Sequence, residues 1–305
     1  MTKHFKHEIA IENVTFNIPR GKIFGFIGPS GCGKTTTVRL LTGVYKPTAG
    51  QAMVFNRRPM DFTQKMRAKI GYMSQLFVLY PNLSVWENLN FAASIYGVSL
   101  QRNHKLGQIL DFVELNGHQS KLVRQLSGGM QRRLSLAATL VHDPELLFLD
   151  EPTTGIDPIL RRKFWDHFKK LQQEGRTLFV TTQYVGEAAY CDFVGVMAQG
   201  HLLMVETPAG LRRRAFGGEV VDLRTHERIT HDHLEHIRGL PFVQGDVKRL
   251  GETGLRLIVD KASTAIPALL TCCQTQKLVL EAIEEYAPPF DDVFVELVKK
   301  EPGRG

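Results

Sequence analysis

The stretch Gly28-Pro29-Ser30-Gly31-Cys32-Gly33-Lys34-Thr35 decides the fold, because it fits the phosphate-binding pattern GxxxxGK[ST]. It follows the apolar run 23–27, which is typical of a buried strand, and a helix is expected to begin near Gly33. Glycines let backbone N–H groups face phosphate oxygens, Lys34 reaches the β and γ phosphates, and the Thr35 hydroxyl supplies one Mg²⁺ ligand. The stretch predicts nucleotide contacts from Gly28, Ser30, Gly31, Cys32, Gly33, Lys34, Thr35 and Thr36.

Two carboxylates follow a second apolar run. Residues 146–149 read Leu-Leu-Phe-Leu, and Asp150 and Glu151 come directly after them. In α/β proteins, ligands bind at the carboxyl ends of the strands, so both side chains are expected beside the phosphate loop. We expect Asp150 to hold Mg²⁺, through the water shell of the ion, and Glu151 to orient and deprotonate an attacking water.

Apolar runs alternate with helical segments as far as residue 215, which predicts an α/β core. Residues 70–73 and 177–181 are further strand candidates, and a hairpin is expected to turn at Gln199-Gly200. Residues from about 76 to 141 are expected to form a mostly helical insertion. A small α+β domain is predicted over 216–305, and the pair Gly217-Gly218 marks its beginning. Its helices and strands are expected at 219–224, 230–238, 242–249, 254–260, 264–273, 277–284 and 290–299.

Composition narrows the class of protein without choosing a function. The chain has 305 residues, enough for two domains, and 38 Lys and Arg against 31 Asp and Glu give a net charge of +7. This surplus is compatible with a nucleotide, a nucleic acid or an anionic lipid as partner. No apolar run approaches the ~18 residues of a membrane span. The four cysteines show no CxxC spacing, which favours a reducing cytoplasm over a disulfide framework.

A resemblance to a known protein family rests on the run Leu126-Ser127-Gly128-Gly129-Met130-Gln131. Ser127 is a plausible N-cap of a helix beginning near Gln131, and the glycines expose N–H groups, so the residues alone predict a second anion site. With the phosphate loop, Asp150-Glu151 and this run in their order, residues 1–215 resemble the ATP-binding cassette (ABC) ATPases. The resemblance implies a P-loop NTPase core with an antiparallel N-terminal subdomain and a helical insertion, and ATP and Mg²⁺ as cofactors.

The same resemblance implies that two cassettes pair head to tail. Each ATP then lies between the phosphate loop of one subunit and the signature run of the other. Ser127 and Gly129 are accordingly expected to contact the γ-phosphate of the partner's nucleotide, and Asp157 is expected at the subunit interface. A second copy of this chain is therefore the first partner that the sequence implies.

Three further positions take roles from the resemblance. Phe5 stands where the family has an aromatic residue that stacks on adenine, although the strand that normally precedes it is missing, which suggests an upstream start or a section of a longer protein. Gln75 is expected to sense Mg²⁺ or the attacking water. Gln183 occupies the switch position, where most relatives have histidine, and its neutral amide can donate to the γ-phosphate but cannot carry a proton. We expect hydrolysis to persist with Glu151 as base.

Residues 70–75, 79–88 and 289–297 resemble the drug-exporter subgroup of the family. The resemblance implies an export ATPase, peripheral on the inner face of the cell membrane, that powers a separate transmembrane permease and moves a drug-like or lipid substrate. One apolar cluster consists of Leu76, Phe77, Leu79 and Tyr80. It either receives a short helix of that permease or packs inside the insertion, and the sequence leaves both alternatives open.

Two other functions remain open from the sequence. One is a cassette ATPase that acts on ribosomes or nucleic acid, although the tandem cassettes or long coiled-coil insertion usual in that class are missing, so no nucleic acid is expected. The other is a regulatory module that binds ATP without turnover, an alternative that Gln183 keeps open.

Overall fold

The computed structural model describes residues 1–6, 8–76, 78–99 and 101–300. These residues form two compact units, one from Met1 to Val205 and a second that begins at Glu206. The second unit therefore starts before the boundary expected at residue 215, because helix α7 (Pro208–Phe216) packs against the C-terminal helix α10 (Phe290–Lys299). None of the described helices is long and apolar enough to cross a lipid bilayer.

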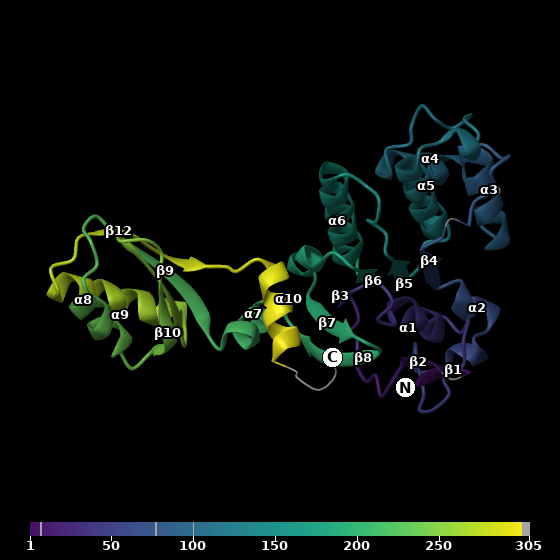
Figure 1. Cartoon of the computed structure of the whole chain (residues 1–305). Coiled ribbons are helices and arrows are strands. Elements are labelled where there is room, and N and C mark those ends of the chain that lie inside the picture. The colour runs from purple at the N-terminus through teal and green to yellow at the C-terminus, as the bar shows by residue number, and fades with distance from the viewer. Residues whose placement is uncertain (7, 77, 100, 301–305) are drawn as a thin grey trace. The chain divides into compact units, whose positions relative to one another are not determined.

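A six-stranded sheet forms the centre of the first unit within the described residues (Figure 1). In spatial order its strands are β4 (Ile70–Met73), β5 (Leu146–Asp150), β6 (Thr177–Thr182), β3 (Ile23–Ile27), β7 (Phe193–Ala198) and β8 (His201–Glu206). The strands from β4 to β7 run parallel, and β7 and β8 form the predicted hairpin. Every residue of β3 and β5 is buried, as expected for parallel strands covered on both faces.

The order of the strands brings the predicted motifs to one edge of the sheet. β3 leads into the phosphate loop and then into helix α1 (Lys34–Leu41), as predicted. β6 lies directly between β3 and β5, so the ends of these three strands are neighbours. The carboxylates after β5 and Gln183 after β6 therefore lie beside the loop. The remaining helical elements of this unit outside the insertion are η1 (Pro59–Asp61), α2 (Gln64–Arg67), α6 (Pro158–Gln173) and η3 (Val185–Tyr190).

The helical insertion consists of α3 (Val85–Ile95), α4 (Asn103–Phe112) and α5 (Gly128–Leu140), which lie together in Figure 1. The insertion is less continuously helical than expected, because residues 113–127 form turns with only the short 3₁₀ helix η2 (Val123–Gln125). Glu114 and Gly117 adopt positive φ angles there, which a helix does not allow.

Helix α5 begins earlier than the expected start near Gln131. Ser127 is its N-cap, as predicted, and its hydroxyl accepts a hydrogen bond from the Met130 N–H at 3.3 Å. Because the cap fixes the first turn directly after it, Gly128 and Gly129 belong to the helix itself. The glycines that expose backbone donors therefore form the helix N-terminus.

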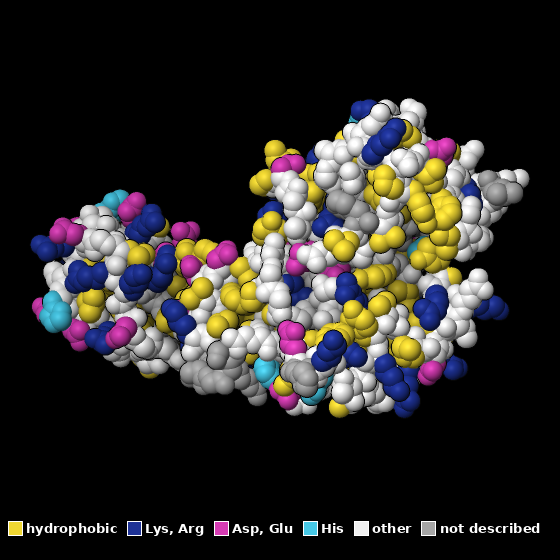
Figure 2. Space-filling model, turned by 45° about the vertical axis from the view of Figure 1, so that its right-hand side comes forward, with side chains coloured by type: hydrophobic (Ala, Val, Ile, Leu, Met, Phe, Trp, Pro, Cys, Tyr) yellow, Lys and Arg dark blue, Asp and Glu magenta, His cyan; other side chains and the backbone are white. Residues whose placement is uncertain are grey.

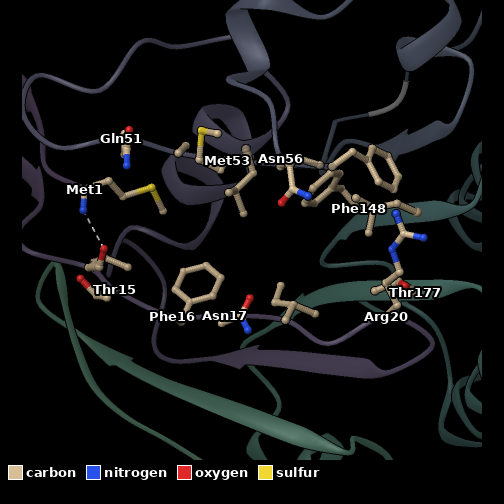
Figure 3. Close-up of a pocket in the computed structure, with 17 residues that line it drawn as sticks. Met1, Thr15, Phe16, Asn17, Arg20, Gln51, Met53, Asn56, Phe148 and Thr177 are labelled. Atoms are coloured by element: carbon tan, nitrogen blue, oxygen red, sulfur yellow. Dashed lines mark hydrogen bonds between the residues drawn. The ribbon is translucent and has the colours of Figure 1, made fainter.

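The N-terminal residues form the antiparallel element that the family resemblance implies, in which β1 (Lys3–Phe5) pairs with β2 (Glu8–Ile11). A short strand therefore does lead into Phe5, although the sequence suggested that this strand is missing. Beside this element lies a groove of about 360 Å³ lined by residues from segments 14–18 and 51–56 (Figure 3). Phe16 and Phe148 line this groove, and the Met1 ammonium at its end donates to a backbone carbonyl at 2.8 Å. No predicted nucleotide ligand lines this groove.

The second unit contains an antiparallel sheet with two helices, the small α+β domain expected from the sequence. In spatial order its strands are β10 (Val243–Arg249), β11 (Gly254–Val259), β9 (Glu219–Thr225) and β12 (Leu280–Tyr286). Helices α8 (His231–Arg238) and α9 (Ala262–Thr275) connect them in the chain order of the split β-α-β motif. β12 begins later than the expected residue 277, because Lys277 adopts a positive φ of 58° that ends the preceding turn.

A charged cluster on the sheet of the second unit joins three of its strands. The Arg256 guanidinium donates to both carboxylate oxygens of Asp222, at 2.7 and 2.8 Å, and lies 3.4 Å from the centre of the Tyr286 ring. Asp222 is buried, at 7 % exposure, so this bidentate pair satisfies a carboxylate that water does not reach freely.

Candidate nucleotide-binding site

Glycines shape both ends of the phosphate loop. A Cβ at Gly28 would lie 2.2 Å from the Met197 carbonyl oxygen, and Gly33 has a φ of +105°, so neither position accepts a side chain. Gly33 precedes α1 and provides no side-chain cap, which leaves the first N–H groups of the helix directed at the loop. The loop and the helix start together make an anion site, as the sequence predicts.

Lys34 lies buried across the mouth of this loop, at 4 % exposure. Its ammonium donates to the carbonyl oxygens of Gly28 at 2.8 Å and Pro29 at 2.9 Å, and it lies 3.6 Å from the Glu151 carboxylate. A phosphate oxygen that enters the loop offers this ammonium an anionic partner in place of two neutral carbonyl oxygens.

Asp150 supports a metal site at the end of β5. Its Oδ1 atom accepts hydrogen bonds from Thr35 Oγ1 at 3.2 Å and Thr181 Oγ1 at 2.5 Å, whereas Oδ2 is buried without a partner in the described part of the chain. Burial raises the pKa of Asp150, although both hydroxyls oppose this shift. A hydroxyl and a carboxylate with an unpaired oxygen fit the hard, water-coordinated Mg²⁺ ion.

The backbone at Glu151 adopts an unusual conformation. Its φ is +51°, in the left-handed region that costs a residue with a side chain ~1–2 kcal/mol. Two hydrogen bonds hold the conformation, from the Glu151 N–H to the Thr181 carbonyl at 3.1 Å and to the Thr181 hydroxyl at 3.0 Å. Thr181 therefore holds both the Asp150 carboxylate and the Glu151 backbone, a role that its position in an apolar strand run did not indicate.

The Glu151 side chain is held by groups from three other segments. Its Oε2 atom accepts hydrogen bonds from Gln75 Nε2 at 3.1 Å and Thr154 Oγ1 at 3.2 Å, and Lys34 approaches Oε1. The structure thus brings Gln75 and Glu151 together, as the sequence predicts. Sequence reasoning missed Thr154, whose only signal is its place shortly after the carboxylates.

Gln183 closes the site from the side of β6. Its amide oxygen accepts a hydrogen bond from the Ser30 hydroxyl at 2.8 Å. The phosphate loop and the predicted switch residue therefore touch directly.

A cleft of about 450 Å³ opens over the phosphate loop, Gln75 and Glu151, whereas the predicted residues Gly28, Cys32, Asp150 and Gln183 do not line it. The predicted residues that line it are Phe5, Ser30, Gly31, Gly33, Lys34, Thr35, Thr36, Gln75 and Glu151. Phe5 stands at its edge, half-exposed, with its ring edge-on to Tyr45 and 5.1 Å from it. The Gln199-Gly200 turn also lines the cleft, although the sequence marked it only as a hairpin turn. Cys32 is different, because its side chain is buried and burial raises the pKa of its thiol.

The signature run and Asp157 do not line this cleft. Ser127 is exposed at the start of α5, and Gly129 packs near Ile156, 3.8 Å from where a Cβ would stand. Asp157 is exposed as the N-cap of α6, where the Leu160 N–H donates to it at 2.9 Å and lowers the pKa of its carboxyl. These three residues therefore lie outside the cleft of their own chain.

The phosphate loop, the paired carboxylates and the separate signature run define a nucleotide-binding cassette. Residues 11–154 match the family model described as "ABC transporter". The chain is also 30% identical over 299 residues to the linearmycin resistance ATP-binding protein LnrL of Bacillus subtilis, covering 97% of this chain and 95% of LnrL. The chain therefore belongs to the ABC transporter family.

Two other relatives are named for multidrug transport or for drug resistance. The chain is 40% identical over 223 residues to the probable multidrug ABC transporter ATP-binding protein YbhF of Escherichia coli, 73% of this chain but only 39% of YbhF. It is 30% identical to the daunorubicin/doxorubicin resistance ATP-binding protein DrrA of Streptomyces peucetius, over 97% of this chain and 90% of DrrA. The MJ0796 cassette, solved as a dimer bound to ADP and Pi, superposes with a TM-score of 0.62 at 29% identity, covering 68% of this chain and 94% of MJ0796.

Proposed function

We propose that this cassette binds ATP with Mg²⁺ and hydrolyses it. The observation that carries the proposal is the setting of Glu151, a carboxylate held by Gln75 and Thr154 at the mouth of the phosphate loop, beside the Lys34 ammonium. A carboxylate placed there can accept a proton from a water that attacks the γ-phosphate. Thr35 and Asp150 would hold Mg²⁺, which would supply positive charge to the phosphates, and Lys34 with the loop N–H groups stabilises the negative charge that develops.

Gln75 and Gln183 complete the proposed mechanism. The Gln75 amide orients Glu151 and places the attacking water, while the Gln183 amide stays neutral and donates to the γ-phosphate, with its oxygen kept on Ser30. Phe5 offers its exposed ring to the adenine base. These roles follow from the family resemblance, the contacts of Gln75 and Gln183 support them, and each can be tested by substitution.

The active form is proposed to be a head-to-tail pair of two copies. Ser127, Gly129 and Asp157 lie outside the cleft of their own chain and are exposed or half-exposed, so they are free to meet the nucleotide of a second copy. The exposed N-terminus of α5 is suited to bind a phosphate. The dimeric MJ0796 cassette supports this arrangement by analogy.

A membrane permease is the proposed second partner. Figure 2 shows hydrophobic side chains gathered on the surface of the helical insertion. The exposed large apolar residues there are Leu76, Val78, Tyr80, Phe91, Ile95 and Tyr96. Of the predicted cluster, Leu76 and Tyr80 are exposed and Leu79 is half-buried, while Phe77 lies outside the described residues. The patch is suited to receive an apolar segment of a permease.

Export is the proposed direction of transport, because the relatives include proteins named for multidrug transport and for resistance to linearmycin and to daunorubicin. The cassette would then work at the inner face of the cell membrane, and no nucleic acid is expected as partner. The chain spans about two fifths of the length of YbhF, and the substrate is set by the permease rather than by these residues.

The ATPase proposal is tested by comparing Glu151→Gln with Glu145→Gln. The first removes the base and is expected to lower kcat by about 10²–10³ while ATP still binds. The second changes an exposed glutamate that pairs with Lys69 at 2.6 Å, and it is expected to leave kcat within about twofold. Turnover by Glu151→Gln at the unmutated rate would show that Glu151 is not the base. A protein that binds ATP but never turns it over would favour the regulatory module that Gln183 keeps open.

The permease proposal is tested with an exposed apolar residue in each unit. Leu76→Asp places a charge on the patch, and Val279→Asp does the same at an exposed position of the second unit. Only Leu76→Asp is expected to reduce recovery of the membrane partner in detergent, with ATPase activity unchanged. If the protein associates with ribosomes instead of membranes, the proposed role in transport is wrong.

A further inference from the structure

Arg132 links the signature helix to the segment that carries Gln75. It lies in α5 and is only 5 % exposed, which is unusual for a charged side chain. Its Nη1 atom donates to the carbonyl oxygen of Gln75 at 2.9 Å and to that of Ser74 at 3.4 Å. Burial lowers the pKa of Arg132 while the two site carboxylates oppose this, and an arginine remains charged in proteins.

A short path of direct contacts therefore joins two places that serve different nucleotides. It begins at the exposed Ser127 cap of α5, continues along the same helix to Arg132, and passes to the backbone of Gln75. From there the Gln75 side chain donates to Glu151 at 3.1 Å. The bond from Arg132 is charge-assisted and roughly twice as strong as a neutral one.

We propose that Arg132 is a positioning residue that couples engagement of the partner's nucleotide at Ser127 to the placement of Glu151 in its own site. The inference rests on the proposed head-to-tail pairing. Because a helix moves as a rigid element and the Arg132 side chain is buried, a shift of the α5 N-terminus displaces the Gln75 backbone with it. Gln75 then carries that displacement to the base.

The adjacent residue provides a matched control. Arg133 lies on the same helix, but its Nη1 atom donates to the Glu114 carbonyl at 2.9 Å, within the helical insertion and away from Gln75. Arg132→Met and Arg133→Met each remove one guanidinium from α5, and Arg132→Lys keeps the charge with a single donor group. Each substitution is made alone and together with Gln75→Ala, and kcat, KM, thermal unfolding and ATP-dependent pairing by light scattering are measured.

Arg132→Met is expected to lower kcat by about ten- to a hundredfold, since a ~1 Å misplacement of a catalytic group can cost about 10²-fold. KM and ATP-dependent pairing should stay close to those of the unmutated protein, so pairing no longer produces its full activity. The kcat of Arg132→Lys should lie between that of Arg132→Met and that of the unmutated protein. In the Gln75→Ala background, Arg132→Met should lower kcat by less than about a further twofold, because the effects of residues that act through one another are non-additive. Arg133→Met should leave kcat within about twofold in both backgrounds.

Several results would overturn the inference. An equal loss of kcat with and without Gln75 would show that Arg132 does not act through it, and a loss from Arg133→Met of the same size would point to general damage to α5. If Arg132→Met does not fold, Arg132→Lys carries the same comparison. A failure of the unmutated protein to hydrolyse ATP removes the proposed function, whereas additive losses in an active protein remove only this inference.

Discussion

The Ser30 hydroxyl donates a hydrogen bond to the Gln183 amide oxygen at 2.8 Å, across 153 positions of the chain. Because the amide oxygen is engaged with Ser30, the amide nitrogen is the end that remains for a phosphate oxygen. A neutral amide keeps this geometry at every pH at which the protein is folded. The contact at the switch position is therefore independent of proton concentration.

Replacing Gln183 with histidine is expected to create a pH dependence that the unmutated protein lacks at this position. Imidazole titrates near pH 6.5, so kcat of Gln183→His should change between about pH 5.5 and 7.5 more than kcat of the unmutated protein. Gln183→Ala, which cannot titrate, serves as control and should lower kcat at all pH values alike. Superimposable pH profiles of the histidine variant and the unmutated protein would contradict this role for residue 183.

Asp150→Asn is expected to raise the melting temperature without nucleotide, by about 2–4 °C near neutral pH. Burial raises the pKa of Asp150, so folding favours its protonated form. The ionised carboxylate therefore costs stability increasingly as pH rises from the ordinary Asp range through the raised pKa, and asparagine avoids this cost. The gain should shrink as pH is lowered toward the ordinary Asp pKa, and scans from pH 5 to 8 in a metal chelator measure it.

The same substitution should have the opposite effect once Mg²⁺ and ATP are present. The unmutated protein gains stability from the bound metal, whereas Asp150→Asn lacks the charge that holds it. An Asp150→Asn protein that is as stabilised by Mg²⁺ and ATP as the unmutated one would exclude Asp150 from the metal site.

Phe5→Ala is expected to weaken ATP binding by about tenfold, because stacking of a base on an aromatic ring contributes ~1–3 kcal/mol. Phe5→Tyr keeps a ring of the same shape and should bind ATP nearly as well. Binding of inorganic triphosphate, which has no base, provides the internal comparison. If Phe5→Ala weakens triphosphate and ATP equally, the ring supports the loop instead of the adenine.

Arg256→Met is expected to destabilise the second unit by ~1–3 kcal/mol, because it leaves the buried Asp222 carboxylate without its bidentate partner. Arg228→Met is the matched control, since its pair with Glu252 is about three-quarters exposed on both sides and contributes little. Urea unfolding measures both. Adding Asp222→Asn to Arg256→Met should recover part of the loss, and no recovery would assign the effect to the Tyr286 contact.

Local signals were enough to predict the core and the residues around the phosphate loop. A short apolar run, a glycine-rich turn and a helix specify the loop because the sequence neighbours themselves make the site. Gln75 and Glu151 could be placed together only through the family resemblance, and the structure joins them at 3.1 Å. The sequence predicted the helical insertion as a region but not its interruption after Phe112, since a positive φ at Glu114 depends on packing rather than on residue type.

What the sequence did not indicate is mostly the support behind these residues. Thr181 and Thr154 lie in runs with no distinctive pattern, and their roles arise from where β6 and the turn after β5 meet. Arg132 was not singled out from the sequence, yet it is buried and donates to the Gln75 carbonyl 57 positions away. The strand order of the second unit likewise depends on pairing between distant segments, which periodicity does not encode.

The position of Lys34 has a consequence for how the cassette behaves between turnovers. Its ammonium satisfies two carbonyls of its own loop and lies beside the base, so the loop supplies its own counter-charge for Glu151. Any anion that enters the loop has to displace partners that Lys34 already holds. A polyphosphate chain contacts more of the loop N–H groups than a single phosphate or sulfate ion does, so it is expected to offset more of that cost.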